Sequence, residues 1–409
     1  MLINKNFTYL FINTIISIMG SSLSYIAIYW SFANDTSTTA ITLLTTLAFV
    51  SRFLFYMFLS PIVDRYESIT LMRTTMLSRC VLLITFGALM LFWKISIFYL
   101  MIMIVIQTAL ECIYSPSSVK IIVQIVDKEN QSRANALINL VDRTGILIGM
   151  IIGGGVIAFF KLDLILIIEG ISFFIGACML SLISLPKIEI KSRNHKKNYI
   201  NEWKEGINFI VNHKWMLAVL GLAIASNIAI TPTVTLLAPY SLKVLHVSST
   251  MYSYLQAASI LGSMFTAILF SKWKFEKMNL SISFSVACFL QAIFMICFGL
   301  STSFQLSLAC LFLIGLTVAL FNIPFTTILQ HYVPQEILGR VRSTLVAVST
   351  GVSSIMYMLS GVMSSYYGIA NTIQIYGGVG LVLIVLIMYM RPFKDIEKIK
   401  SSAVTNATS

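Results

Sequence analysis

Residues 126–129 read Val-Asp-Lys-Glu and residues 132–135 read Ser-Arg-Ala-Asn, and a similar pattern returns 207 residues later. There, residues 333–336 read Val-Pro-Gln-Glu and residues 339–342 read Gly-Arg-Val-Arg. In a chain of 409 residues, this spacing predicts a duplicated unit in which the same hydrophilic turn joins corresponding apolar helices. Two such halves in a membrane are typical of a transporter.

The composition indicates an integral membrane protein. Apolar residues make up 57% of the chain and charged residues only 11%, whereas about a quarter of a soluble domain is charged. A membrane-crossing helix needs about 20 mostly apolar residues because its backbone polar groups must pair internally. Twelve stretches qualify, at roughly residues 7–32, 38–60, 69–93, 96–124, 134–160, 164–185, 216–240, 250–270, 278–300, 304–330, 343–366 and 371–390. We therefore expect an all-α protein of 12 transmembrane helices in two six-helix pseudo-repeats.

The distribution of lysine and arginine predicts the topology. With the amino terminus inside, the outer loops carry only Lys94, Lys161 and Lys243, and short loops with few basic residues lie outside. Both termini are then cytoplasmic, in a multi-pass protein of the bacterial cytoplasmic membrane. The net charge of +12 is explained by this topology and by attraction to anionic lipids, so nucleic acid is not an expected partner.

The residues that usually carry enzyme or metal chemistry do not form a pattern. All six cysteines fall in predicted apolar spans without metal-ligand spacing, and the four histidines are scattered over loops and a span end. Neither a zinc site nor a nucleophile-base pair is indicated. We expect no enzyme activity, no metal and no cofactor. The first apolar segment is too long for a signal peptide and lacks a cleavage site, so it is interpreted as a retained span.

The predicted domains are an amino-terminal bundle (1–186), a basic cytoplasmic linker (187–214), a carboxy-terminal bundle (215–391) and a cytoplasmic tail (392–409). Within the linker, Glu202 to His213 has the spacing of an amphipathic helix that can lie on the inner membrane surface. The linker is either a hinge between the bundles or a regulatory, partner-binding segment, and nothing in its composition demands a ligand.

Two local motifs suggest moving parts. Asp64-Arg65 follows Pro61 in the turn after the second span, where the acid can cap a helix amino terminus and the arginine can pair across a bundle interface. In the fifth span, glycines recur at positions that let a neighbouring helix approach closely. They are Gly145, Gly149, Gly153 and Gly154. Ordinary small-residue packing is the alternative.

Both motifs resemble those of the major facilitator superfamily. The turn with Asp64-Arg65 is similar to the family loop between helices two and three, although Ser60 and Glu67 replace its glycines and Arg73 stands in for its tandem basic residues. The glycine run resembles the antiporter motif of the exporters, with Met150 where proline is usual. The resemblance implies export rather than import.

Further motifs look like one branch of that superfamily. Pro116, Arg133 to Leu137, Pro324 and Gly339 to Val341 resemble the drug-proton antiporters that include macrolide efflux proteins and enterobactin-type siderophore exporters. Gln107 occupies the position of an arginine that is common in the superfamily, so a proton-relay role is not carried over to it.

Charges inside a bilayer are costly and usually have a partner and a task. Glu111, near mid-depth in the fourth span, is the first proton-coupling candidate, unless it is a protonated carboxyl hydrogen-bonded to a neighbour. Asp142 is the second. We expect it to pair with Arg52 or another helix rather than with the adjacent Arg143, either as a switchable gate or as a static pair. Glu169 and Arg79 are weaker candidates because they can reach an interface.

By family analogy the first, fourth, seventh and tenth spans line the substrate cavity. Their polar and aromatic residues suit an amphipathic ligand, although such residues also serve in packing. The candidates are Asn13, Ser17, Tyr25, Gln107, Asn227, Thr231, Asn322 and Phe325.

The predicted function is export of a small amphipathic molecule by proton antiport and alternating access, powered by the proton gradient. The cargo is a macrolide-like drug or a siderophore or other metabolite, and its charge stays open: arginines facing the cavity suit an anion, and Glu111 with Asp142 suits a cation. An importer of the same fold and a non-transporting scaffold or sensor are the alternatives. We expect a monomer whose other partners are protons and membrane lipids.

Overall fold

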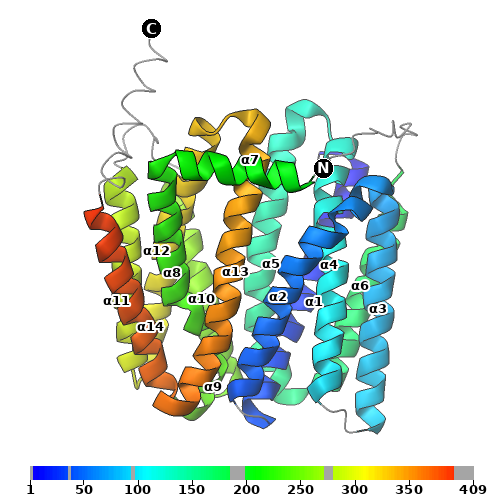
Figure 1. Cartoon of the computed structure of the whole chain (residues 1–409). Coiled ribbons are helices and arrows are strands. Elements are labelled where there is room, and N and C mark those ends of the chain that lie inside the picture. Colours follow the sequence, from blue (N-terminus) through cyan, green and yellow to red (C-terminus); the bar gives the residue numbers. More distant parts are fainter. Residues whose placement is uncertain (1–2, 36–37, 94–96, 185–198, 271–279, 391–409) are drawn as a thin grey trace. The chain divides into compact units, whose positions relative to one another are not determined.

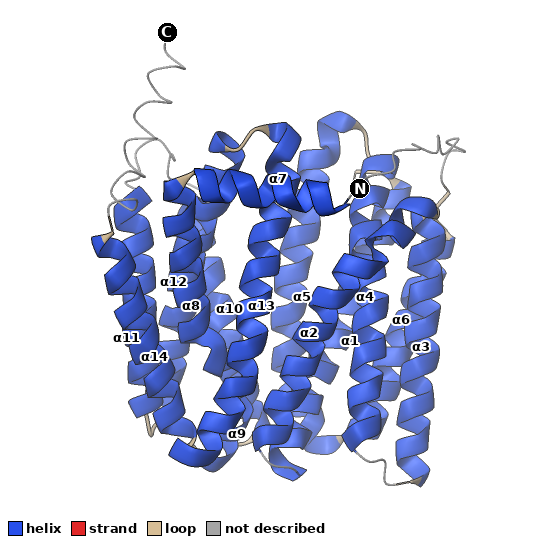
Figure 2. Cartoon of the chain, viewed as in Figure 1, coloured by secondary structure: helices blue, strands red, loops and turns tan. Residues whose placement is uncertain are grey.

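The computed structural model describes residues 3–35, 38–93, 97–184, 199–270 and 280–390. The described part is helical, with short connecting turns (Figure 2). Twelve of its helices are long and apolar enough to cross a membrane, which confirms the predicted fold class. The first six are α1 (Lys5–Asp35), α2 (Thr38–Arg65), α3 (Ser68–Phe92), α4 (Ile97–Ile125), α5 (Gln131–Phe159) and α6 (Leu162–Ser181). The second six are α8 (Lys214–Thr235), α10 (Ser249–Phe270), α11 (Leu280–Leu300), α12 (Phe304–Tyr332), α13 (Gln335–Tyr367) and α14 (Ile369–Tyr389).

The repeat seen in the sequence corresponds to repeated structure. The first copy joins α4 to α5 through a short 3-10 helix, η1 (Lys128–Asn130), and the second joins α12 to α13. Both α4 and α12 contain a proline, Pro116 and Pro324. The valine that opens each copy, Val126 or Val333, is buried, so the turn is anchored in the same way in both halves.

Contacts divide the chain into two compact units that exchange short segments. The first unit comprises residues 1–37, 46–194 and 248–257. The second comprises residues 38–45, 195–247 and 258–409. The beginning of α2 therefore belongs with the second half of the chain, and the beginning of α10 belongs with the first. The limits of the four predicted domains stay a prediction.

In the first unit, α1 packs against α5 and α6, and α3 packs against α4 and α6 (Figure 1). Glycines bring α3 and α6 together: a Cβ at Gly87 would lie 2.7 Å from the carbonyl oxygen of Asp163, and one at Gly170 would lie 3.2 Å from that of Cys80. Small residues allow such close backbone approach between helices, and the contact area stabilises the bundle without a hydrophobic driving force in lipid.

In the second unit the predicted span over 216–240 is wrong as a single helix. It ends at Thr235, and a separate short helix, α9 (Leu237–Lys243), follows. Pro239 explains the break, because in a continuous helix its ring would clash with the carbonyl of Thr235. In α9 it stands in the first turn, where no backbone N–H is needed.

The linker contains the predicted amphipathic helix, observed as α7 (Tyr199–Asn212). It lies across the ends of α8 and α13 (Figure 1) and packs against both. Ile210 is 3% exposed and belongs to the core of the second unit, while Glu205 forms an ion pair with Arg340 of α13. One apolar and one charged contact thus attach α7 to the second unit. The linker residues 187–198 lie outside the described part.

A reciprocal glycine contact between α10 and α12 generates a stability prediction. A Cβ at Gly262 would collide with the carbonyl oxygen of Phe312, and one at Gly315 would collide with that of Ser259. Because backbone atoms cannot yield as a flexible side chain does, we expect Gly315→Ala to destabilise the protein by about 1–3 kcal/mol. The measurement is the thermal unfolding midpoint of the purified protein in detergent.

Gly351→Ala is the matched control, since Gly351 also lies within a helix, α13, and a Cβ there meets no atom within 4 Å. Equal unfolding midpoints for the two variants would contradict the close contact between α10 and α12.

Candidate functional site

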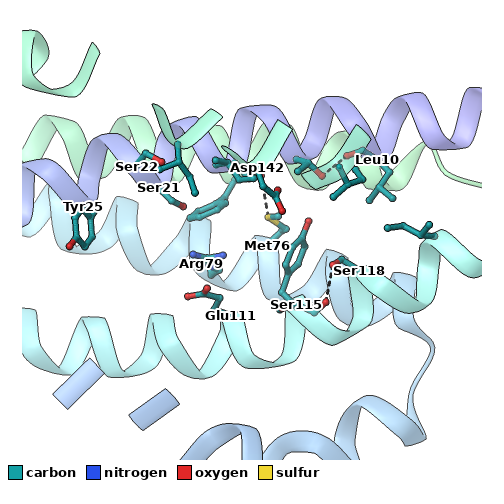
Figure 3. Close-up of a pocket in the computed structure, with 18 of the residues that line it drawn as sticks. Leu10, Ser21, Ser22, Tyr25, Met76, Arg79, Glu111, Ser115, Ser118 and Asp142 are labelled. Carbon is teal, nitrogen blue, oxygen red and sulfur yellow. Dashed lines mark hydrogen bonds between the residues drawn. The ribbon is translucent and has the colours of Figure 1, made fainter. Parts of the chain in front are cut away.

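The first unit contains a cavity of about 430 Å³ that three charged residues of the spans line, Arg79, Glu111 and Asp142, and we call it the charged cavity. Five helices line it: α1, α3, α4, α5 and α6. Figure 3 shows Arg79 and Glu111 beside each other on one side of this space and Asp142 entering from another helix. The other lining residues are Leu10, Thr14, Ser17, Ile18, Ser21, Ser22, Tyr25, Met76, Tyr114, Ser115, Ser118, Ile122, Ile138, Ile146, Met150 and Phe173.

The glycine run of α5 sets the position of that helix against α1. A Cβ at Gly145 would lie 3.0 Å from Ile18, and one at Gly149 would lie 3.0 Å from the carbonyl oxygen of Met19. Gly153 faces the α1 backbone in the same way. Since residues four apart share a helix face, these glycines form one stripe that contacts α1.

A neighbouring stripe of α5 faces the cavity. Ile138, Asp142, Ile146 and Met150 recur every four residues and all line it. Met150, where the antiporter motif usually has proline, thus contributes a flexible apolar side chain to the wall. Gly154 differs from the other glycines, because a Cβ there would lie 2.6 Å from Cβ of Ser253 in the α10 segment of this unit.

Glu111 forms an ion pair across the α2–α4 contact. Arg52 donates from Nη2 to Oε2 of Glu111 at 2.9 Å, and the two side chains are 42% and 40% exposed. The expected pairing of Arg52 with Asp142 is therefore wrong. Depth along the spans placed both acids within reach of Arg52, and the rotation of α2 and α4 selects Glu111.

Arg79 is held inside the unit by three different interactions. Its Nε donates to Oε1 of Gln107 at 2.7 Å, and its guanidinium carbon lies 4.0 Å from the centre of the Phe173 ring. Its charge also acts on Glu169 of α6. Arg79 and Glu169 are only 9% and 5% exposed, so the expectation that either reaches an interface is wrong. Their burial makes them part of the charged interior.

Asp142 has a different environment from Glu111. It lines the cavity and is partly exposed. Among the described side chains none forms a hydrogen bond or an ion pair with its carboxylate, and Arg143 acts on it only at longer range. Arg143 itself is exposed and is not among the cavity-lining residues. The structure thus separates the two adjacent charges of α5.

In the wall of the cavity, the amide of Asn13 is hydrogen-bonded to the phenol of Tyr114. Asn13 is fully buried and donates from Nδ2 to the Tyr114 hydroxyl at 2.7 Å, while its Oδ1 accepts from Ser17 at 3.4 Å. Of the predicted cavity residues of this unit, Ser17 and Tyr25 line the space. Asn13 does not line the cavity but is hydrogen-bonded to Tyr114, which does. Gln107 does not line it either and accepts a hydrogen bond from Arg79.

The second unit has its own cavity, of about 300 Å³, between α8, α12 and α13. The predicted residues Asn227, Asn322 and Phe325 line it, together with Arg342. Thr231 does not, since it is 1% exposed and donates to the carbonyl oxygen of Asn227 at 2.9 Å. Amides, hydroxyls and aromatic rings dominate this wall, and Arg342 is its one charged residue.

A larger cavity of about 1060 Å³ lies at helix ends of the first unit and includes Trp30, Trp93 and Phe159. Aromatic side chains gather in this way at membrane–water interfaces, so it is a less specific feature than the charged cavity. Within the described residues, no three His, Cys, Asp or Glu side chains are grouped as a metal site requires.

The region of Asp64-Arg65 differs from its prediction. The helix α2 continues to Arg65, and α3 begins at Ser68 with Glu67 at its N-cap. Asp64 thus lies in the last turn of α2, three residues before the N-cap of α3, and the side chains of Asp64 and Arg65, with the roles predicted for them, lie outside the described ones. Arg73 instead caps α6, donating to the carbonyl oxygens of Leu180 at 2.9 Å and Ile183 at 3.2 Å, where a cation offsets the helix dipole.

Comparison with known proteins identifies the family. The profile of the Major Facilitator Superfamily matches residues 10–353 and, in a second match, residues 234–407. The chain belongs to the Major Facilitator Superfamily. This facilitator is therefore a multi-pass membrane transporter, as its twelve apolar helices require.

The chain is similar to a bacterial protein in sequence and to solved transporters in fold. It is 21% identical over 393 residues to the "Uncharacterized MFS-type transporter YvqJ" of Bacillus subtilis (strain 168), covering 93% of this chain and 92% of that protein. A bacterial homologue of the human lysosomal transporter Spinster has a TM-score of 0.71 at 14% identity, over 96% and 97% of the two chains. The nucleoside transporter NupG has a TM-score of 0.71 at 12% identity, over 94% and 98%.

Sequence reasoning missed several residues of the charged cavity. Tyr114, Met76 and Phe173 carry no signal in a single sequence, since aromatic residues and methionines are common in any apolar helix. Arg342, which lines the cavity of the second unit, was also missed, although it carried a signal because it ends the second copy of the repeated turn. Arg79 was recognised as a charge within a span, but its partners come from two other helices.

The contact of Arg79 with Gln107 can be tested by a double-mutant cycle. We expect Gln107→Leu and Arg79→Lys each to lower the unfolding midpoint, and the double variant to lose less than the two losses combined. Both changes remove the same charge-assisted hydrogen bond, whose coupling should be about 1.5–3 kcal/mol. Thermal unfolding in detergent is the measurement, with the exposed Arg143→Lys as control. Strictly additive losses would mean that the two side chains do not interact.

Proposed function

We propose that this transporter exports a small amphipathic molecule from the bacterial cytoplasm in exchange for protons. The single observation that carries the proposal is the ion pair of Glu111 with Arg52 at the charged cavity of the first unit. A proton that binds the carboxylate at such a site neutralises it. The negative charge that attracts the arginine is then lost.

The partly exposed geometry of this pair supports a coupling role over a purely structural one. Glu111 lines the cavity, so a proton can reach it, and its side chain remains 40% exposed. A proton on Glu111 ends the ionic contact with Arg52 and frees α4 from α2 at that point. Loss of the proton restores the contact. This alternation is the kind of two-state change that can be linked to alternating access.

Export is the direction favoured by the glycine run of α5 through its resemblance to the antiporter motif. The packing of that run against α1 supports the same role, because a contact made of glycines lets two helices shift along each other. The cavity wall of serines, tyrosines, methionines and isoleucines suits an amphipathic cargo of the drug or siderophore kind.

The remaining parts of the proposal concern the setting of the protein. It would work as a monomer in the cytoplasmic membrane with both termini inside, and the proton gradient would supply the energy in place of a cofactor. Lipids are its expected neighbours, because many large apolar side chains are exposed on the described helices.

Transport in inverted membrane vesicles with an imposed pH gradient tests the coupling. We expect wild-type protein to accumulate a fluorescent amphipathic dye or a macrolide, or alternatively a purified iron chelator, and to lose the accumulation when the gradient is collapsed. Glu111→Gln should abolish gradient-driven accumulation, because the amide cannot release a proton.

Glu205→Gln is the matched control. Glu205 also pairs with an arginine, Arg340, but on α7 outside the membrane-spanning helices, so its loss should leave transport near the wild-type rate. Gradient-dependent accumulation that survives in Glu111→Gln would refute the proposed role of Glu111, and movement in the opposite direction would show an importer.

A further inference from the structure

We propose that the cargo is an organic cation and that Asp142 is its counter-ion in the charged cavity. This inference rests on the proposed function, because it names the substrate class of the same site. The charged side chains around the cavity differ in their partners. The arginines are bound by other protein groups, whereas no described side chain bonds to Asp142.

The cations near the cavity are already occupied. Arg52 is paired with Glu111 at 2.9 Å. Arg79 donates to Gln107 at 2.7 Å and is covered on one face by Phe173, whose ring centre lies 4.0 Å from the guanidinium carbon. An anionic cargo would have to displace one of these interactions to gain a cation.

The carboxylate of Asp142 is in the opposite situation. It lies on the cavity-facing stripe of α5, and no described side chain bonds to it. The neighbouring cation, Arg143, projects from an adjacent position about 100° around the helix and is exposed outside the cavity. A charged group in a cavity within a membrane protein is stabilised by an opposite charge, and a cationic ligand supplies one.

The surroundings of Asp142 suit the rest of such a ligand. Ile138 and Ile146 stand one helix turn before and after it, and Met76 and Tyr114 line the same cavity. Apolar and polarisable side chains bury hydrocarbon, and an aromatic face attracts a cation. The Asp142 position therefore combines one negative charge with an apolar wall, which is the complement of an amphipathic cation.

This charge arrangement also explains how cargo and proton can exclude each other. Glu111 lines the same cavity as Asp142. A proton on Glu111 adds one positive charge to the cavity and opposes a cation there, and loss of that proton favours the cation again. Exchange then follows from charge balance, with no direct contact required between the proton and the cargo.

The test is equilibrium binding to the purified full-length protein in nanodiscs, without any gradient. The probes are tetraphenylphosphonium, a permanent cation, and tetraphenylborate, an anion of nearly the same shape. We expect wild-type protein to bind the cation and to prefer it over the anion. Asp142→Asn should weaken binding of the cation by about tenfold or more, and Asp142→Glu should retain most of it.

The matched control is Asp127→Asn, which removes the same charge from an exposed loop residue before η1 and should leave the affinity unchanged. Unfolding midpoints show whether each variant is folded, and the preference between the two probes in wild-type protein is independent of any variant. Preference for tetraphenylborate, or equal binding of the cation by folded Asp142→Asn, would overturn the inference.

The failure of this inference is distinguishable from that of the proposed function. Binding of the cation through Asp142 without gradient-driven movement would refute proton antiport and leave Asp142 as the cation site. Gradient-driven export of an anion alone, lost in Glu111→Gln, would support antiport and exclude the cationic cargo.

Discussion

A charge inside a membrane-spanning bundle must be compensated, and this constraint organises the first unit of the protein. Arg79, from α3, is bound by groups from α4 and α6, and Arg52, from α2, is bound by Glu111 of α4. Each interaction ties one helix to another within the bundle. The charged cavity is thus a consequence of how the helices satisfy their polar side chains. Asp142 stands out because no side chain in the described part of the protein bonds to it.

The two units use this constraint differently. In the first, charged side chains surround a cavity, whereas the second unit has a cavity lined by amides, hydroxyls and rings with Arg342 as its one charge. The helical framework is repeated, down to the prolines of α4 and α12 and the buried valines after them. The helical framework is thus repeated, while the charged cavity-lining side chains are concentrated in one unit.

The fold was predictable because a membrane-crossing helix is one continuous stretch of about 20 mostly apolar residues, which can be located from the sequence directly. Length and hydropathy located all twelve spans, and only Pro239, which breaks the seventh, was overlooked. The site was predictable in part. Glu111 and Asp142 are visible as charges in apolar stretches, but the partner of each depends on the rotation of two helices about their axes. A single sequence shows which residues share one face of a helix, but it does not show which other helix packs against that face. For this reason Arg52 was assigned to the wrong acid and Arg79 was assigned to an interface.

The exchanged segments of the two units have a consequence for how the halves depend on each other. The start of α10 supplies Ser253 to Gly154 of the first unit, and the start of α2 supplies Thr42 to Gly361 of the second. Either half synthesised as a separate polypeptide would lack the segment that packs on its glycine. The two halves are therefore not interchangeable modules joined by a tether, because each is completed by a fragment of the other.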